Sequence, residues 1–306
     1  MKHKKQHFIP QSYLSAWTDP ETPSGQEPYV WLVNKKSLEL RNRAPKNIMF
    51  ERDLYTIETE EGDRDLSLEE GLSVLEGEFV RVRDRVISSR LPLNSADRLA
   101  LLAYVSAMHS RTPASSDRLS PFWEELLAKM KAMSAWAGTA SPEQLQRAAR
   151  VAPPDPERSH IVTVEEIQSI VESPIPSLLA PSITAEMEAL SVLDLAIVET
   201  TTSPGFVTSD NPVVWFDPEG HRRQWPHQGP ALIYPAIEIS MPVSTRYSLL
   251  LNRQGANGYI KLSKSGPLAE AEVVNRANWR VQATASEFLV VSRRVLLWEW
   301  FYAPPN

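Results

Sequence analysis

The spacing of apolar residues changes once along this chain, and the change limits the folds open to it. From residue 66 to residue 190, apolar side chains recur at intervals of three and four, first at Leu68, Leu72, Leu75, Phe79, Val82 and Val86. This spacing is typical of helices that bury one face. From residue 191 the chain carries short apolar runs separated by Pro, Gly and Asn, such as DLAIVET, PVVWF and YSLLL, which are typical of strands. The sequence therefore predicts an α+β fold, with a mainly helical N-terminal and central region and a mixed or antiparallel C-terminal sheet.

The first sixty residues predict a short helix followed by strands. Pro10 suits the first turn of a helix that runs to about Trp17, because that position has no intrahelical N–H bond to lose. YVWLV favours a strand, since aromatic and β-branched residues are common in strands. A second extended piece is expected around Leu38–Arg41, and NIMFERDLYTIE is expected to be coil that ends in a short strand.

Capping patterns indicate where the central helices begin and end. Ser95 is the expected N-cap of one helix, which ends before Pro113, because the residue before a proline is disfavoured in a helix. Further helices are expected at about 121–137, at 142–151 with a capping box of Ser141 and Gln144, after the capping box of Thr163 and Glu166, and briefly after Pro181. LAEAEVVNRANWRVQATAS favours one more helix, and LLWEWFYAPP favours a packed final strand.

Length and composition favour one folded unit. The chain has 306 residues, 42% of them apolar, and can therefore bury a substantial core. We expect a single domain over residues 1–306, with a helical part at 66–190 and a sheet-rich part at 191–306. No apolar run approaches the roughly 20 residues that cross a bilayer, so we expect no membrane partner and a cytoplasmic location.

Composition also excludes several kinds of chemistry. The chain has no cysteine, which removes disulfides, thiolate metal sites and cysteine nucleophiles. Its formal charge of −6 argues against a broad nucleic-acid-binding face, although a small basic cleft is compatible with it. The phosphate-binding, dinucleotide-binding, zinc-protease and nucleophile-elbow motifs are all missing from the sequence.

A basic stretch, KKQHFIPQSYLSAW, carries the first polar cluster. His7 titrates near neutrality and suits general acid/base work or metal binding, with Gln11 and Tyr13 close enough along the chain to contact a substrate. The structural interpretation is that Pro10 starts a helix whose aromatic residues dock into the core.

Two further clusters lie on the predicted helices. Glu76 flanks the apolar stripe, so its carboxylate is expected at the edge of the core or in solvent. Arg111 follows His109 at a helix end, where a cation complements the helix dipole or holds a phosphate or carboxylate.

The fourth cluster interrupts the apolar run FVTSDNPVVWF. Asp210 is a candidate metal ligand or base, and Ser209 and Asn211 are candidates for fixing a substrate. The structural interpretation is a turn, because Asp and Asn bond readily to nearby backbone and Pro212 cannot donate to a sheet.

These clusters resemble the bacterial family DUF4238, a domain of unknown function. The matching segments occur in family order over most of residues 4–291, and are QHFIPQSYLSAW, PKNIMFERDLY, LEGEF, SRTP, FVTSDNP, SMPVSTRYSLLL and VNRANWRVQA. The resemblance implies that the polar residues of these motifs meet, but it implies no reaction.

We expect His7, Glu76, Arg111 and Asp210 to share one concave site between the helices and the sheet. The leading hypothesis is a hydrolase that cleaves a phosphodiester in nucleic acid or a nucleotide, in bacterial defence. His7, Glu76 and Asp210 would be catalytic, Arg111 would hold the phosphate, and a divalent metal is a candidate cofactor. A histidine near two carboxylates favours its charged form, so we expect the pKa of His7 to be raised.

Two other hypotheses use the same residues. In the first, the protein is a non-enzymatic module in which Arg111 and the TSDNP turn bind an anionic ligand or a partner. In the second, His7 and Arg111 brace the N-terminal segment against Glu76 and have no function beyond stability.

Overall fold

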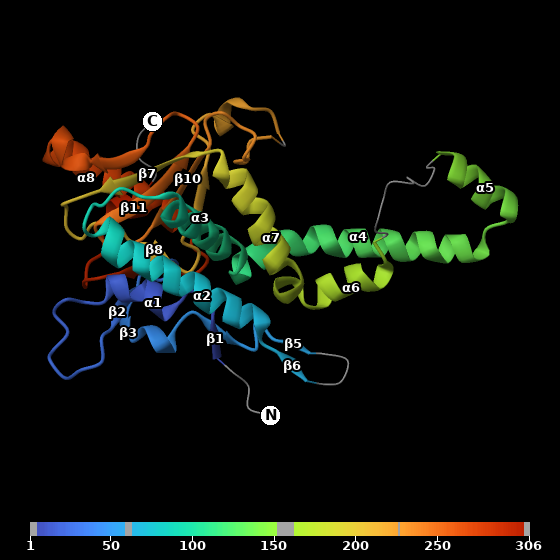
Figure 1. Cartoon of the computed structure of the whole chain (residues 1–306), viewed down its shortest axis with the longest axis horizontal. Coiled ribbons are helices and arrows are strands. Elements are labelled where there is room, and N and C mark those ends of the chain that lie inside the picture. The colour runs from blue at the N-terminus through green and yellow to red at the C-terminus, as the bar shows by residue number, and fades with distance from the viewer. Residues whose placement is uncertain (1–4, 59–62, 152–161, 226, 303–306) are drawn as a thin grey trace.

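The computed structural model describes residues 5–58, 63–151, 162–225 and 227–302, and its fold is α+β as predicted. Figure 1 shows a body of sheets and helices from which one long helix extends. The N-terminal segment contains strand β1 (Lys5–His7), helix α1 (Gln11–Leu14) and a 3₁₀ turn to Trp17. Short strands follow at β2 (Val30–Asn34), β3 (Leu40–Arg43), β4 (Phe50–Arg52), β5 (Ile57–Glu58) and β6 (Arg64–Asp65). The predicted helix through Trp17 is confirmed.

The helical region contains α2 (Ser67–Arg81), which continues as a π-helical turn to Ile87, α3 (Ser95–Ser110), α4 (Pro113–Thr139), α5 (Pro142–Val151), α6 (Val164–Glu172) and α7 (Pro174–Ser191). The N-cap of α3 is Asn94 rather than Ser95, because the Asn94 side chain accepts the Asp97 N–H at 2.8 Å. The capping boxes at Ser141 and Thr163 are both confirmed.

Prolines misled the prediction at two helices. Pro113 lies at the first position of α4, where its missing N–H costs nothing, so α4 begins earlier than the predicted residue 121. The predicted short helix after Pro181 is instead an 18-residue helix that starts at Pro174 and contains Pro181 in its interior.

The C-terminal half contains β7 (Asp194–Glu199), β8 (Thr208–Ser209), β9 (Val214–Phe216), β10 (Glu238–Pro242), β11 (Tyr247–Asn252), β12 (Gly258–Lys261), α8 (Pro267–Thr284) and β13 (Phe288–Val291). A five-stranded mixed sheet has the order β12-β7-β11-β10-β9, in which only the β12–β7 pair is parallel. A second sheet has the order β3-β2-β13-β8. N-terminal and C-terminal strands therefore share one sheet.

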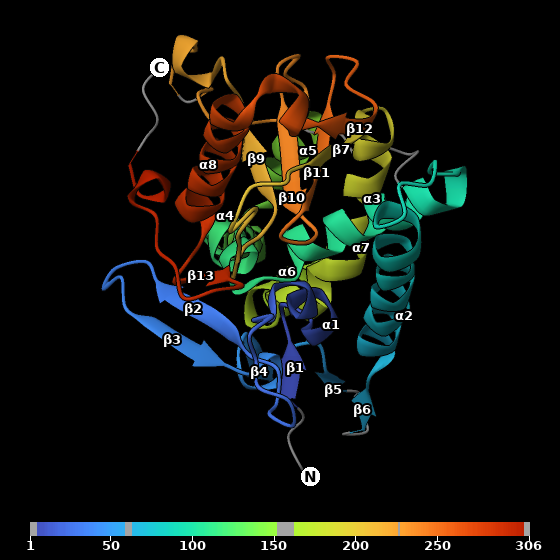
Figure 2. The same ribbon diagram turned by 90° about the vertical axis from the view of Figure 1, so that its left-hand side faces the viewer.

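Helices cover the five-stranded sheet on two sides. Figure 2 shows α8 on one side and α2, α3 and α7 on the other. The largest apolar cluster joins the second of these sides to the sheet through Phe79, Tyr104 and Leu249, all fully buried. The N-terminal residues Tyr13 and Trp17 belong to the same cluster.

Two regions depart from this packing. The distal part of α4, with α5, extends away from the body (Figure 1) and leaves Met133 and Trp136 exposed. The segment predicted as a packed final strand is a 3₁₀ turn at Trp298–Trp300, in which Trp300 is buried and Trp298 is exposed. No helix in the described ranges is long and apolar enough to cross a membrane.

Candidate functional site

The N-terminal pocket is a cavity of about 750 Å³ formed by β1, the start of α1, the turn at Lys46 and Asn47, α2 and the end of α3. It is lined by Lys5, Gln6, His7, Pro10, Gln11, Ser12, Lys46, Asn47, Tyr55, Glu69, Leu72, Ser73, Glu76 and Arg111. Four of the predicted site residues, His7, Gln11, Glu76 and Arg111, therefore share one pocket.

Helix α2 supplies one wall of the N-terminal pocket through Glu69, Leu72, Ser73 and Glu76. These positions are three and four apart, which places them on one face of a helix. The same spacing that predicts the buried stripe of α2 therefore also brings two carboxylates to the edge of the cavity.

Arg111 joins three segments beneath this pocket. It is 2% exposed, and its Nη1 donates to Glu76 at 2.9 Å, its Nη2 to the His7 carbonyl at 2.8 Å and its Nε to the Tyr55 hydroxyl at 3.1 Å. Burial opposes the charge of Arg111, but Tyr55 and Glu76 raise its pKa overall. Because each guanidinium nitrogen already has an acceptor, Arg111 braces β1 against α2 and α3 rather than presenting a free fork to a phosphate.

Gln6 also lines the N-terminal pocket, and it was not among the residues predicted from the sequence. Its side chain is 2% exposed, accepts the Tyr55 N–H at 2.6 Å and donates to Glu69 at 3.0 Å. Strand β1 alternates along the chain, so Gln6 faces inward between two residues that are less buried. The signal available in the sequence was its place directly before His7 in the N-terminal motif.

His7 lines the pocket, and one of its ring nitrogens has no hydrogen bond to the described residues. Its ring hydrogen-bonds the backbone of Lys46 and meets the Phe50 ring edge-on at 5.5 Å. Nε2 is buried and has no hydrogen-bond partner among the described residues. In the tautomer protonated at Nδ1, Nε2 is an unused hydrogen-bond acceptor.

The predicted rise in the pKa of His7 is wrong. Burial lowers the pKa of His7, and the nearby charges of Arg111 and Lys5 lower it further, while the bond to Lys46 opposes them. The carboxylate expected to raise it, Glu76, is paired with Arg111 instead. The surroundings of His7 therefore favour its neutral form.

Ser12 is a second residue of the pocket that the sequence analysis missed. The residue lines the cavity, and its hydroxyl is buried and, like His7 Nε2, lacks a partner in the described part of the chain. Gln11 lies next to it at the exposed first position of α1. Two residues that line one cavity thus each have a buried polar atom without a hydrogen bond to the described residues, which is uncommon in native structures.

Asp210 does not line the N-terminal pocket, and the prediction that it joins His7, Glu76 and Arg111 is wrong. Its carboxylate accepts the N–H groups of Ser286 at 2.8 Å, Glu287 at 2.7 Å and Phe288 at 3.0 Å. Burial raises the pKa of Asp210, and these three bonds oppose the rise. The carboxylate thus fixes the entry to β13.

The neighbours of Asp210 serve the same turn. Ser209 is fully buried and its hydroxyl accepts the Asn211 N–H at 3.1 Å. The Asn211 side chain donates to the Thr284 carbonyl at 3.0 Å. The structural interpretation of the TSDNP segment therefore accounts for all three side chains.

Tyr13 lies in the core rather than in the pocket. It is fully buried, and its hydroxyl bonds Thr208 and the Pro242 carbonyl, each at 2.7 Å. Trp17 similarly donates to the Phe206 carbonyl at 2.9 Å. The N-terminal motif and the FVTSDNP motif do meet, but through these aromatic anchors and not through His7 and Asp210.

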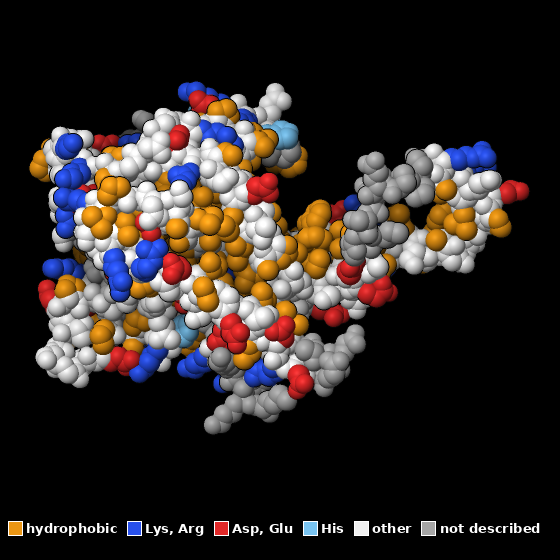
Figure 3. Space-filling model, viewed as in Figure 1, with side chains coloured by type: hydrophobic (Ala, Val, Ile, Leu, Met, Phe, Trp, Pro, Cys, Tyr) orange, Lys and Arg blue, Asp and Glu red, His pale blue; other side chains and the backbone are white. Residues whose placement is uncertain are grey.

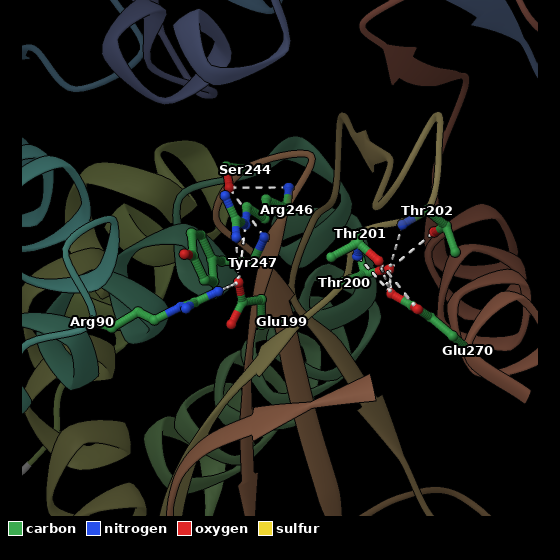
Figure 4. Close-up of polar contacts among 9 residues, drawn as sticks. All are labelled: Arg90, Glu199, Thr200, Thr201, Thr202, Ser244, Arg246, Tyr247 and Glu270. Atoms are coloured by element: carbon green, nitrogen blue, oxygen red, sulfur yellow. Dashed lines mark hydrogen bonds and ion pairs between the residues drawn. The ribbon is translucent and has the colours of Figure 1, made fainter. Parts of the chain in front are cut away.

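A further group of buried charges lies at the end of β7 (Figure 4). Glu199 is paired with Arg90 and with Arg246, and Glu270 of α8 accepts hydrogen bonds from the hydroxyls of Thr200 and Thr201. Bonds from the backbone of Thr201, together with these hydroxyls, lower the pKa of Glu270 although burial opposes them. These contacts join the sheet to α8 and to the segment after α2.

A metal site is not evident from the side chains. Within the described ranges, no group of three or more His, Asp or Glu residues is placed to hold a metal ion. The divalent metal therefore stays a prediction from the sequence.

The comparisons with known proteins give one result. A family model described as "Protein of unknown function (DUF4238)" matches residues 5–294. No curated protein and no solved structure is significantly similar to the chain.

Proposed function

The chain belongs to the DUF4238 family, and we propose that it binds a small anionic molecule bearing hydroxyl groups, of the nucleotide or sugar-phosphate class, in the N-terminal pocket. The observation that carries the proposal is the pair of buried atoms His7 Nε2 and Ser12 Oγ, neither of which has a partner among the described residues. A buried polar atom without a hydrogen bond costs about 1–3 kcal/mol. A ligand that bonds to both atoms removes this cost, and the protein gains affinity for it.

The polarity of the pocket selects the ligand groups that enter it. A neutral His7 offers a lone pair at Nε2, and Glu76 is also an acceptor, with a side chain that is 25% exposed. Both need a donor on the ligand, such as a sugar hydroxyl or an amino group. Ser12 can either donate or accept, so it tolerates either kind of partner.

Two lysine side chains of the N-terminal pocket can pair with the anionic group of the ligand. Lys5 and Lys46 both line the pocket and are exposed, whereas the charge of Arg111 is neutralised by Glu76. Lys46 is paired with Glu27 at 2.6 Å, and both side chains are about half exposed. Such a surface pair is worth little, so Lys46 can exchange it for a phosphate.

The test is a thermal-shift and calorimetric comparison of AMP, ribose phosphate, adenosine and inorganic phosphate. AMP or ribose phosphate should raise the melting temperature, because a ligand of the native state stabilises it. His7→Gln and Ser12→Ala should abolish or weaken this shift, while the exposed controls His221→Gln and Ser263→Ala should keep it. The proposal is wrong if none of the four compounds binds.

A second candidate is cleavage of a phosphodiester in the same pocket, and the state of His7 favours it. A neutral imidazole on a residue that lines a cavity is suited to act as a general base. In this candidate reaction Arg111 does not hold the phosphate and Asp210 is not catalytic, in contrast to the hypothesis from the sequence.

Turnover separates the two candidates. RNA, DNA and nucleotides should be incubated with the protein in Mg²⁺, in Mn²⁺ and in chelator, and His7→Gln should lose any activity while its melting temperature stays near that of the parent. If a ligand binds and no product forms under any of these conditions, the protein is a binding module.

A further inference from the structure

A second cavity, the central pocket, has a volume of about 340 Å³ and lies between the end of α3, the start of α4, α7 and β9. We propose that the central pocket binds a small carboxylic acid with an apolar body. The proposal is independent of the N-terminal pocket, because the two cavities have no lining residue in common.

A row of charged and polar side chains crosses one end of the central pocket. His109 Nδ1 lies 2.8 Å from Glu186 Oε1, and His109 Nε2 lies 3.1 Å from Arg118 Nη2. The imidazole therefore donates to the carboxylate and accepts from the guanidinium. Glu186 is only 10% exposed, so this row anchors an exposed arginine to a buried carboxylate.

Arg118 keeps donors for a ligand. Its Nη2 bonds His109 and Ser115, at 3.1 Å and 3.2 Å, whereas Nη1 and Nε have no hydrogen-bond partner within the described residues. Cδ lies between Nε and Nη1, so these two nitrogens do not form a fork, but Nη1 can donate a charge-assisted hydrogen bond to one oxygen of a carboxylate. Because His109 and Ser115 already orient it, less side-chain entropy is lost when the ligand binds.

Trp215 adds a second unused donor. Its ring stacks on His109, with centroids 4.8 Å apart and planes inclined by 22°. Its indole N–H is buried and, in the part of the chain that the structure describes, has no acceptor. A buried N–H of this kind favours a hydrogen-bond acceptor on the ligand. The guanidinium of Arg118, which has only donors, favours the same kind of group.

The rest of the wall is apolar. It includes Ile175, Leu178 and Leu179 of α7, with Leu232 from the segment before β10. Figure 3 shows hydrophobic side chains gathered over the region where α7 meets α3 and the base of α4. An apolar wall with donors at one end matches an amphiphilic acid, since the wall excludes water from the hydrocarbon part.

The test is calorimetric titration of the whole protein with octanoate, octanol and acetate. Octanoate should bind, whereas octanol lacks the charge and acetate lacks the apolar body, so each should bind at least about tenfold more weakly. Arg118→Met should weaken octanoate binding by about tenfold or more. Trp215→Phe keeps the stacked ring and removes the N–H, and should weaken binding by about three- to tenfold.

A matched control separates this result from a general loss of charge. Arg222 is exposed, lies outside the central pocket and is only loosely paired with Glu219 at 3.6 Å, so Arg222→Met should bind octanoate as the parent does. Each variant is first checked for a cooperative melt, and Arg118→Gln replaces Arg118→Met if that variant does not fold. The proposal is overturned if octanoate does not bind, if octanol binds as tightly as octanoate, or if the Arg118 variant keeps the affinity of the parent.

Discussion

The TSDNP turn and the N-terminal pocket both bury polar side chains, but they differ in what those side chains bond to. In the turn, Asp210 receives three backbone N–H bonds, so its charge is used within the protein. In the pocket, His7 Nε2 and Ser12 Oγ are buried without a partner among the described residues. A buried polar group that makes all its hydrogen bonds adds to the stability of the fold, whereas one that makes none lowers it. The turn is therefore a structural feature, and the pocket is the better candidate for function.

The largest expected effect tests the structural side of this comparison. Asp210→Ala removes the acceptor of three N–H groups and should lower the free energy of unfolding by about 3–5 kcal/mol in urea denaturation. Exposed Asp117→Ala is the matched control and should change it by less than about 0.5 kcal/mol. A stable Asp210→Ala protein that has lost ligand binding would reverse the assignment of the turn.

A smaller loss is expected at the brace that forms the floor of the pocket. Arg111→Met leaves Glu76 and the His7 carbonyl without their donor, and should cost about 2–4 kcal/mol, because Glu76 is partly solvated. Adding Glu76→Gln should recover part of this loss, since the unpaired carboxylate is then gone. The brace is refuted if the two substitutions are simply additive in denaturation experiments.

Ser12→Ala should lose no stability while still weakening ligand binding. Removing the hydroxyl breaks no bond to a described residue and ends the cost of an unpaired buried group, so the free energy of unfolding should rise, by up to about 1–3 kcal/mol. Affinity for the ligand of the pocket should fall about five- to tenfold. A large loss of stability in the urea titration would mean that the hydroxyl has a structural partner.

The smallest effect is a pH dependence from His7. Its folded-state pKa lies below the ordinary value of 6.5, so the unfolded chain takes up the proton first as the pH falls. The contribution of His7 to stability is therefore complete above about pH 6.5 and is lost as the pH falls through the folded-state pKa. Melting curves of the parent and His7→Gln should diverge only in that window, and parallel curves throughout would contradict the neutral histidine.

Periodicity predicted much of the fold, because apolar spacing reports directly on burial. The helix stripe from Leu68 to Val86 and the strands of the C-terminal sheet were both found in this way. Prolines were harder to interpret: Pro113, expected to end one helix, also begins the next, and Pro181, expected to precede a short helix, lies inside a longer one. The pairing of β2 with β13 joins residues too distant along the chain for any local pattern to show.

The candidate site was predicted in part for the same reason. Glu76 and Arg111 lie beside apolar stripes, so their place at the edge of the core followed from spacing. The sequence did not show that Arg111 would use all its nitrogens on Tyr55, Glu76 and His7, because these bonds depend on tertiary geometry. Asn278, in a motif noted for its resemblance, proved to hold the backbone of Gly205 and Val207.

The bond from Tyr13 to the Pro242 carbonyl spans 229 residues, and this separation has a consequence for synthesis on the ribosome. At about 5–20 residues per second, the anchor of the N-terminal segment is made roughly 10–50 s before its acceptor. During that interval Tyr13 and Trp17 belong to a nascent chain whose sheet has not yet been translated. The segment that carries Tyr13 and Trp17 is thus translated well before the strand on which it docks, and its aromatic residues are accessible to chaperones during that interval.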